Sequence, residues 1–414
     1  MRKSDAVYPQ RCGFSAADRR SHLTRGSAGG ALIGHVSEEV IVVGNGVAGY
    51  ACAARLAERG VPVTMIGPGL PHDRPPLSKR ALVTGRVPVL ADAAQLAERG
   101  IEHIDGLVTE CDLDRRRLVV SRSADGATLE LDAPTLVWAT GLRYPKPPVP
   151  GFEQAEENTT GRGLDSLVRR LTPPPRRVIV VGAGLIGTET AATLAAAHDV
   201  TLLDMVDRPL ARFLPRVADA ARVALDQVGV RFLGSCKIDS VDIDVDGAVV
   251  RTSSHGDLPC DVVVSAAGFR SSLPPELTDA DARELTLPAD ERLRVIGRDE
   301  LWACGDCVSF PHPRWGRIGI PHWDHALWSG RHVAESILGS TAPYEREPYF
   351  FSDIGPLRIQ QIGVADAAAE WHDEDGLVVG RDPSGVPACV LLLNAPTRLR
   401  EARELIAFAA TGAK

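Results

Sequence analysis

The stretch that decides the fold is "EEVIVVGNGVAGYACAARLAERGVPVTMIG", residues 38–67. It begins with a β-branched strand, ends in a second strand, and has a helix with Ala and Leu on one face between them. Gly44, Gly46 and Gly49 open that helix in the spacing G-x-G-x-x-G. Such glycines permit a tight turn, close approach of the backbone to a pyrophosphate, and close packing of the helix, whose N-terminus attracts the anion. The stretch therefore predicts a dinucleotide-binding unit.

The same pattern returns in "RRVIVVGAGLIGTETAATLAAAHDVTLLD", residues 176–204, with Gly182, Gly184 and Gly187. The segments after the two loops are also alike. Alternating segments with an Asp-Gly turn, "SADGATLEL" and "DSVDIDVDGAVVRT", precede "TLVWATG" and "DVVVSAAG". Asp-Gly between alternating segments is typical of a hairpin. The sequence thus predicts an α/β protein with two Rossmann-like units, which would hold two dinucleotides that exchange a hydride.

The two units differ in their selectivity residues. Asp204 ends the strand after the second loop, where a carboxylate can accept both ribose hydroxyls of NAD. Met205 and Val206 follow it, without an arginine for the 2′-phosphate of NADPH, so NADH is the expected donor. The first unit has Pro68 and Gly69 after its second strand and no acidic residue there.

Bulk composition narrows the class of protein. With 414 residues, 44% hydrophobic and 24% charged, the chain is long enough for several globular domains. A net charge of -8 argues against a general nucleic-acid binder, and no apolar run is long enough for a membrane span. Residues 1–37, rich in Arg, Ser and Gly, predict a disordered extension, with a transit peptide as the alternative. Eight scattered cysteines and no signal peptide favour the cytoplasm.

Further motifs carry a resemblance to a known family. They are "DRPPLSK" (73–79), "ATG" (139–141), Glu189 after the second loop, Gly-Asp at 305–306, "HWDHA" (322–326) and "PYFFSDIG" (348–355). The chain resembles the FAD-dependent pyridine-nucleotide reductases that serve ferredoxins and rubredoxins. The resemblance implies a FAD domain (38–150 and 268–338), an NAD domain (151–267) and a small α+β C-terminal interface domain (339–414).

The resemblance also implies site residues. Lys79 would lie near the flavin ring, Trp323 beside it, and Glu189, on the first turn of its helix, would pair with Lys79. A positive charge there stabilises the reduced, anionic ring. Asp306 would bind the ribityl chain. The full set of cofactor-binding residues is Gly44, Gly46, Gly49, Arg74, Lys79, Thr140, Gly141, Arg143, Gly305, Asp306, Trp323, Gly182, Gly184, Ile186, Gly187, Glu189, Asp204 and Gly268.

The sequence departs from the family pattern at two places. Pro68 and Gly69 stand where the family usually carries an acidic residue, which bears on FAD affinity. Pro321 stands where it usually carries a Glu two residues before Trp323, which bears on nicotinamide orientation. Neither departure removes a required proton-transfer group, because hydride transfer depends on alignment more than on an acid or base.

The Cys-x-x-Cys in "LWACGDCVSF", residues 301–310, allows several interpretations. Cys304 and Cys307 bracket Asp306, away from the reactive edge of the ring, which favours packing thiols. A helix that begins just after Gly305 would lower the pKa of Cys307 and leave redox activity open. A zinc half-site has no partner pair at finger spacing.

Four histidines follow in the same region. They lie in a stretch that the resemblance places at the flavin, so positioning and packing is favoured over metal binding. No metal is expected. The four are His312, His322, His325 and His332.

The predicted function is that of a FAD-dependent oxidoreductase, which takes hydride from NADH and passes electrons to a [2Fe–2S] ferredoxin or similar carrier, upstream of a P450 or oxygenase. A flavin-dependent tailoring oxidoreductase that acts directly on a small molecule is one alternative, and a flavin-binding interaction protein with poor turnover is another. Arg398, Arg400 and Arg403 would dock an acidic ferredoxin or simply form a solvated face.

Overall fold

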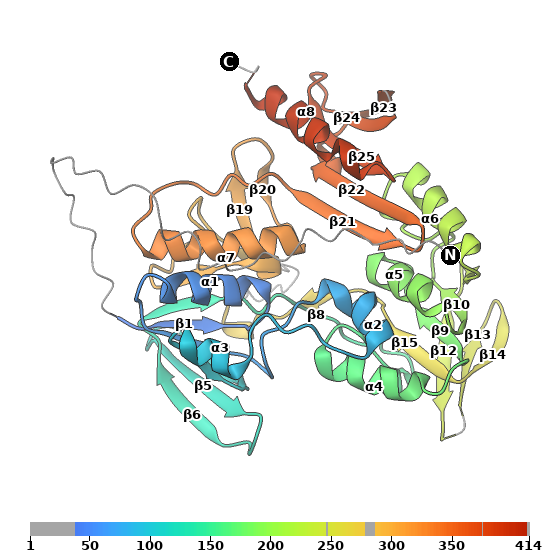
Figure 1. Cartoon of the computed structure of the whole chain (residues 1–414), viewed down its shortest axis with the longest axis horizontal. Coiled ribbons are helices and arrows are strands. Elements are labelled where there is room, and N and C mark those ends of the chain that lie inside the picture. The colour runs from blue at the N-terminus through green and yellow to red at the C-terminus, as the bar shows by residue number, and fades with distance from the viewer. Residues whose placement is uncertain (1–37, 246, 278–285, 375, 412–414) are drawn as a thin grey trace. The chain divides into compact units, whose positions relative to one another are not determined.

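The first glycine loop joins the central strand of a five-stranded parallel sheet to a helix (Figure 1). The computed structural model of the chain describes residues 38–245, 247–277, 286–374 and 376–411. In this sheet the strand order is β18-β7-β1-β2-β3. The strands are β1 (Val40–Val43), β2 (Val63–Ile66), β3 (Ile101–Ile104), β7 (Thr135–Trp138) and β18 (Leu301–Ala303). Because β18 comes from much later in the chain, the first unit is built from two separate stretches of sequence.

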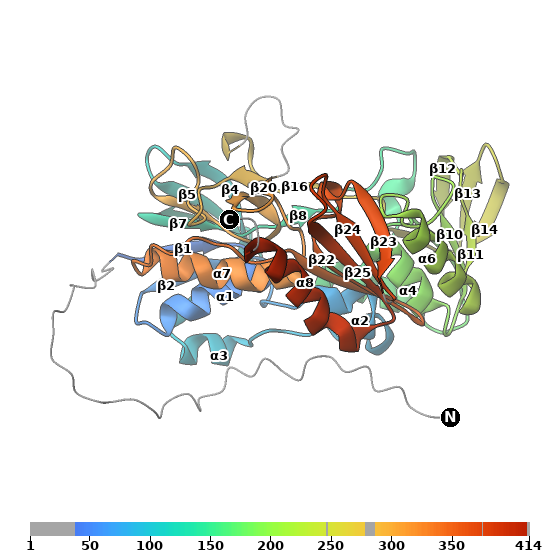
Figure 2. The same ribbon diagram turned by 90° about the horizontal axis from the view of Figure 1, so that it is seen from above.

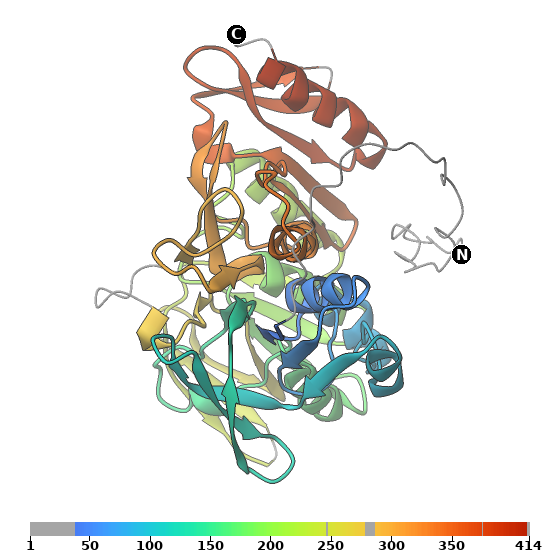
Figure 3. The same cartoon turned by 90° about the vertical axis from the view of Figure 1, so that its left-hand side faces the viewer.

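One face of this sheet is covered by helices, the first of which is α1 (Val47–Ala57). α7 (Trp323–Ile337) packs along α1, and Figure 3 shows α7 nearly end-on beside it. The two helices approach closely at Gly330 of α7, where an added Cβ would lie 2.2 Å from the carbonyl oxygen of Ala48. The shorter helices α2 (Arg80–Thr84) and α3 (Ala93–Glu98) lie in the connection from β2 to β3.

The second glycine loop lies in a four-stranded parallel sheet of order β11-β10-β9-β15. The consecutive residues Val178, Ile179, Val180 and Val181 point alternately to the two faces, and each is at most 8% exposed, which fits a parallel sheet that is covered on both faces. The strands are β9 (Arg177–Val181), β10 (Asp199–Leu203), β11 (Arg231–Leu233) and β15 (Val262–Ser265). The helices of this unit are α4 (Gly161–Leu171), α5 (Leu185–Leu194) and α6 (Pro215–Gln227).

Each predicted hairpin is part of a three-stranded antiparallel meander. The first comprises β4 (Gly106–Asp112), β5 (Arg117–Arg122) and β6 (Thr128–Asp132). The second comprises β12 (Ile238–Ile243), β13 (Ala248–Thr252) and β14 (Gly256–Cys260), side by side in Figure 2. Asp125 accepts a hydrogen bond from Ala127 N (3.0 Å) in the first predicted turn. Asp246 of the second predicted turn lies outside the described residues.

A short antiparallel ribbon lies where the chain passes between the two units. β8 (Leu142–Arg143) pairs with β16 (Arg270–Ser271), so the outgoing and returning segments are hydrogen-bonded to each other. A further small sheet contains β17 (Leu287–Pro288), β19 (Val308–His312) and β20 (Gly316–Ile318). Single-turn 3-10 helices are η2 (Pro75–Ser78), η3 (Phe152–Gln154), η4 (Pro275–Leu277), η5 (Gly305–Cys307), η6 (Ala365–Ala367) and η7 (Pro396–Arg398).

The C-terminal part is an antiparallel sheet of order β21-β22-β25-β24-β23 with α8 (Leu399–Thr411) packed on β22 and β25. Ile362, Val390, Leu392, Ala402 and Ile406 form the buried contact between sheet and helix. The strands are β21 (Tyr349–Ile354), β22 (Leu357–Gly363), β23 (Glu370–Glu374), β24 (Leu377–Arg381) and β25 (Pro387–Leu393). This is the α+β architecture that the family resemblance implies. Within the described residues, none of the helices has the length and apolar character needed to span a bilayer.

Candidate functional site

The first glycine loop has the geometry of a pyrophosphate cradle. Gly44 has φ +112°, and a Cβ there would lie 2.2 Å from the carbonyl oxygen of Ala139. A Cβ at Gly49 would lie 1.8 Å from the carbonyl oxygen of Gly44, whereas one at Gly46 would meet nothing within 4 Å. Gly46 is the N-cap of α1 and provides no capping side chain, so the first amides of α1 lack that acceptor. The loop therefore fits an anionic group such as the pyrophosphate of FAD.

The second glycine loop repeats this geometry. A Cβ would clash at Gly182 (2.4 Å from Ala266 O) and at Gly187 (1.8 Å from Gly182 O), and would meet nothing at Gly184. The following helix, α5, also lacks a side-chain N-cap. Ile186 lies in its first turn and is half-buried. The two loops thus offer two equivalent anion sites in one chain.

Asp204 lies at the end of β10, beside the second loop. Its Oδ2 accepts a hydrogen bond from Ala183 N (2.5 Å) and its Oδ1 accepts one from Val206 N (3.1 Å). A carboxylate can accept about four hydrogen bonds in all. Asp204 therefore fixes the loop and keeps acceptor capacity for ribose hydroxyls.

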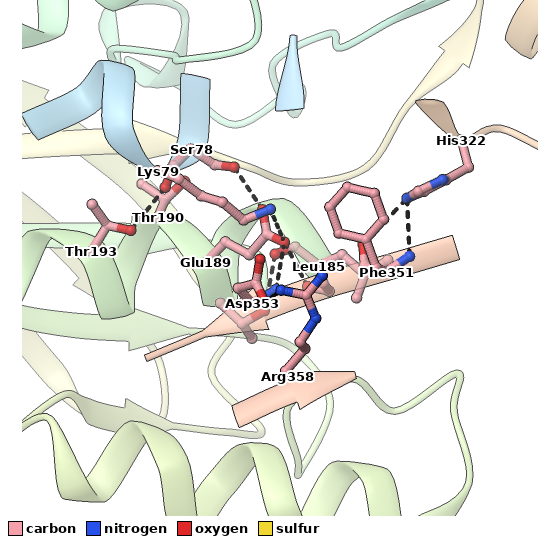
Figure 4. Close-up of polar contacts among 12 residues, drawn as sticks. Ser78, Lys79, Leu185, Glu189, Thr190, Thr193, His322, Phe351, Asp353 and Arg358 are labelled. Carbon is pink, nitrogen blue, oxygen red and sulfur yellow. Dashed lines mark hydrogen bonds and ion pairs between the residues drawn. The ribbon is translucent and has the colours of Figure 1, made fainter. Parts of the chain in front are cut away.

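A buried ion pair joins residues that the sequence places far apart (Figure 4). Lys79 Nζ lies 2.9 Å from Glu189 Oε1, and the two side chains are 12% and 8% exposed. Ser78 Oγ and Ser352 Oγ each donate a hydrogen bond of 2.6 Å to Glu189, and the Lys79 ammonium lies 5.5 Å from the ring centroid of Phe351. The expected position of Glu189 was wrong by one turn, because α5 begins at Leu185 and Glu189 is its fifth residue. The pairing itself is present.

Arg74 and Asp306 face each other near the first loop. Arg74 Nη2 lies 3.9 Å from Asp306 Oδ2, and the guanidinium stacks over Tyr144, donating a hydrogen bond to its hydroxyl. Burial raises the pKa of Asp306, and the charge of Arg74 opposes that shift. A mostly buried carboxylate with one distant cation still has acceptor capacity, which fits a hydroxyl-rich ligand such as a ribityl chain.

Trp323 begins α7 and lies close to Asp73. Burial raises the pKa of Asp73 to about 6, while the Trp323 indole and Lys79 act in the opposite direction. Trp323 Nε1 and Asp73 Oδ1 are both buried and lack a well-aligned hydrogen-bond partner. Unsatisfied buried groups of this kind fit a site that a polar ligand completes. Asp73 thus places a carboxyl group beside Trp323.

The segments that cross between the units meet at Thr140 and Gly141. Thr140 Oγ1 lies 2.8 Å from Ser272 Oγ, and Ser272 donates a hydrogen bond to Gly141 O. Arg143 Nε donates to Ser271 O (2.9 Å). Gly268 has φ +86° and open space at its Cβ position. These contacts bring Thr140, Gly141 and Arg143 to the segment that contains Ser271 and Ser272, although Arg143 itself is exposed.

Cys304 and Cys307 flank the loop that carries Asp306, and both are fully buried free thiols. The single S–H of Cys307 has two carbonyl acceptors within reach, Cys304 O at 3.3 Å and Trp138 O at 3.5 Å from Sγ. Burial raises the pKa of Cys307 to about 12. The suggestion that a helix start lowers this pKa is wrong, since η5 is a single turn and desolvation dominates. The geometry is that of packing thiols.

The four predicted histidines make packing and positioning contacts. His325 stacks on Phe310 and hydrogen-bonds the hydroxyl of Tyr344 (3.0 Å), and burial lowers its pKa to about 4. His322 contacts the backbone of Phe351 (3.2 Å), and His312 packs on Trp315. His332 packs on Tyr344. The described part of the chain contains no group of three or more His, Cys, Asp or Glu arranged to hold a metal ion.

The C-terminal arginines are engaged in ion pairs. Arg398 pairs with Glu401, Arg400 with Glu404 and Arg403 with Glu347. Neutralised in this way, they provide little net positive charge for an acidic partner, and the solvated-face interpretation fits better.

Sequence reasoning missed Ser78, Ser352 and Tyr144. Ser78 and Ser352 bind Glu189, and Tyr144 holds Arg74. The two serines lie inside "DRPPLSK" and "PYFFSDIG", so both belong to motifs whose other residues carry the family resemblance. Their function depends on tertiary contacts, which no local pattern predicts.

Comparison with known proteins places the chain in a family. Residues 38–330 match the pyridine nucleotide-disulphide oxidoreductase family. This match covers both glycine loops and the Lys79–Glu189 pair. The chain therefore belongs to the pyridine nucleotide-disulphide oxidoreductase family, and it is an NAD(P)H-dependent flavin oxidoreductase of the ferredoxin reductase type.

Individual relatives support this class. The chain is 31% identical over 362 residues to the ferredoxin reductase component of chlorobenzene dioxygenase from Cupriavidus sp., covering 81% of this chain and 83% of that protein. It is 28% identical over 366 residues to rhodocoxin reductase from Rhodococcus erythropolis, covering 84% and 82%. The crystal structure of a ferredoxin reductase for the CYP199A2 system from Rhodopseudomonas palustris matches with a TM-score of 0.76 and 25% identity, covering 86% of this chain and 91% of that chain.

Proposed function

We propose that this protein takes a hydride from NADH and passes the electrons to an iron–sulfur protein of the ferredoxin type, which serves an oxygenase or a cytochrome P450. Two observations together carry the proposal. Each glycine loop precedes a helix that has no side-chain N-cap, and a buried ion pair connects Lys79 of the first unit to Glu189 of the second. Two anion sites, and a buried ion pair with one residue from each unit, suit two dinucleotides that meet at one reacting centre.

The chain's residues would bind and orient the reactants. Bound FAD supplies the chemistry that links a two-electron hydride donor to one-electron acceptors. The first loop would hold its pyrophosphate, Asp306 its ribityl chain, and Trp323 would limit the position of the ring. Glu189 fixes Lys79 through an ion pair, and Ser78 and Ser352 fix Glu189. Lys79, held in this way, would supply a positive charge to stabilise the reduced, anionic ring of bound FAD.

The expected donor is NADH because of Asp204. Its carboxylate lies at the end of β10 and accepts hydrogen bonds from Ala183 N and Val206 N, which fix the orientation of the side chain. A 2′-phosphate at that place would meet a fixed negative charge, whereas two ribose hydroxyls can donate to it.

The expected acceptor follows from relatives and from chemistry. Several proteins similar in sequence to this chain are named as ferredoxin reductase components of dioxygenases or as rhodocoxin reductase. One-electron transfer to an iron–sulfur protein requires proximity and no protein nucleophile. Cys304 and Cys307 are buried thiols with raised pKa values, which supports a relay without a redox disulfide.

The test is steady-state reduction of cytochrome c by the purified protein, with NADH or NADPH and with or without a [2Fe–2S] ferredoxin. We expect turnover that requires ferredoxin and has a higher kcat/KM for NADH. Rapid turnover of an organic substrate without ferredoxin would replace this proposal with the tailoring function. Preference for NADPH would reject the role of Asp204.

A further inference from the structure

The segment after β2 lacks the carboxylate that its counterpart has. In the second unit Asp204 follows β10 and binds the glycine loop through Ala183 N. In the first unit Ile66 ends β2 and is followed by Gly67, Pro68 and Gly69. A dinucleotide bound at the first loop would therefore find no acidic side chain at the usual place for its adenosine ribose.

An amide fills the space at this position. Asn45, the residue between Gly44 and Gly46, is 6% exposed, and its Nδ2 donates to Pro68 O (3.2 Å) and Gly69 O (2.8 Å). A Cβ added at Gly67 would lie 2.4 Å from Asn45 Cγ. Asn45 thus ties the glycine loop to the segment after β2, and its amide protons are used within the protein.

A carboxylate reaches the same segment from the neighbouring strand. β3 lies next to β2 in a parallel sheet, so both strands end at the same edge. Asp105 follows β3 directly, and its Oδ1 accepts a hydrogen bond from Gly69 N (2.9 Å). The Ser123 hydroxyl and the Gly69 amide hold the pKa of Asp105 below its usual range. An ionised, oriented carboxylate is therefore present beside the segment in which the acid is missing.

Asp105 retains the capacity to bind a ligand. A carboxylate can accept about four hydrogen bonds, and Gly69 and Ser123 supply two. Its side chain is exposed, so burial does not block the remaining lone pairs. Two vicinal hydroxyls are the donors that such a carboxylate accepts in a dinucleotide site.

We propose that Asp105 binds the adenosine ribose of FAD and replaces the acidic residue absent after β2. The inference rests on the proposed binding of FAD at the first glycine loop. The competing explanation is that Asp105 only fixes the backbone at Gly69. The two explanations make different predictions. Only if Asp105 binds the ribose should the effect of replacing it depend on the ribose hydroxyls of the cofactor.

The test compares Asp105→Asn with the wild type in full-length apoprotein reconstituted with cofactor. Asparagine is nearly isosteric and keeps an oxygen for Gly69 N, so the loop contact can persist. FAD affinity is measured from the quenching of flavin fluorescence, with FAD and with an analogue that lacks the adenosine 2′-hydroxyl. Asp244→Asn is the matched control, because Asp244 is also an exposed carboxylate that accepts a glycine amide, Gly247 N at 2.9 Å.

We expect Asp105→Asn to bind FAD about tenfold or more weakly, as for loss of a charged hydrogen bond. The wild type should prefer FAD over the analogue by a similar factor, and the variant should lose most of that preference. Asp244→Asn should behave as the wild type. An unchanged preference in Asp105→Asn, with or without weaker binding, would overturn the inference and leave Asp105 a structural role. A wild-type protein that does not bind FAD at all would reject the proposed function together with this inference.

Discussion

Replacing Glu189 by Ala removes the partner of a buried lysine and should have two measurable consequences. At the observed Lys79–Glu189 separation of 2.9 Å, an effective dielectric constant of about 20 gives an attraction of about 6 kcal/mol. Part of this offsets the desolvation of both charges, so the net effect is smaller. Breaking a buried pair by removing one partner costs about 3–5 kcal/mol, and we expect a loss of this size in the free energy of unfolding. Ser78 and Ser352 also lose their acceptor.

The second consequence concerns flavin reduction. Without Glu189, Lys79 is free to leave its position, so hydride transfer from NADH should slow while FAD stays bound by the first loop and Asp306. Each 1.4 kcal/mol of lost transition-state stabilisation corresponds to about tenfold in rate. Anaerobic stopped-flow measures this rate as the bleaching of flavin absorbance.

Two further variants separate charge from shape. Glu189→Gln keeps hydrogen-bond acceptors for both serines, so it should retain more stability than Glu189→Ala. The double variant Lys79→Met, Glu189→Leu removes both charges and should be more stable than Glu189→Leu alone, because no buried charge is left unpaired. Reduction of Glu189→Ala at the wild-type rate, or equal destabilisation in the single and double variants, would refute the reasoning.

Three other predictions concern the same site. Asp306→Ala should lose FAD on gel filtration, since it removes a mostly buried acceptor beside Arg74; retention of full flavin content would contradict the ribityl assignment. The double variant Cys304→Ala, Cys307→Ser should keep NADH-driven flavin reduction. Anaerobic dithionite titration of the wild type should consume about two electrons per FAD, and a value of about four would indicate a redox disulfide. The pKa of Asp73 is raised to about 6, so the folded state binds this proton more tightly than the unfolded chain and loses stability as pH rises from about 4 to about 6. Asp73→Asn mimics the neutral acid, so its melting temperature should rise relative to that of the wild type as pH increases across this window. A difference in melting temperature that does not change with pH would argue against the raised pKa.

The glycine loops were predictable because their requirements are local. At Gly44 and Gly49 an added Cβ would collide with the backbone of the same unit, and at Gly46 the space is open. Each of these conditions follows from the strand-loop-helix geometry, which the spacing of three glycines encodes. The apolar strands before each loop were equally clear from their β-branched residues.

The missed features depend on contacts between distant segments. β14 was not predicted because "GDLPC" has a proline and mostly exposed residues, and pairing with β13 decides its conformation. Ser352 reaches Glu189 only because β21 packs on α5. Asp105 reaches Gly69 only because β2 and β3 end at one edge. The pKa of Cys307 was misjudged because its burial depends on the surrounding core.

The most direct test of the proposed function is transfer of electrons from the NADH-reduced protein to an iron–sulfur protein. The holoprotein is reduced anaerobically with NADH and mixed in a stopped-flow instrument with oxidised [2Fe–2S] ferredoxin. We expect the flavin to be reoxidised while about two ferredoxins are reduced per FAD, because each ferredoxin accepts a single electron. A flavin that stays reduced with a panel of such ferredoxins, yet is reoxidised at once by a small organic substrate, would contradict it.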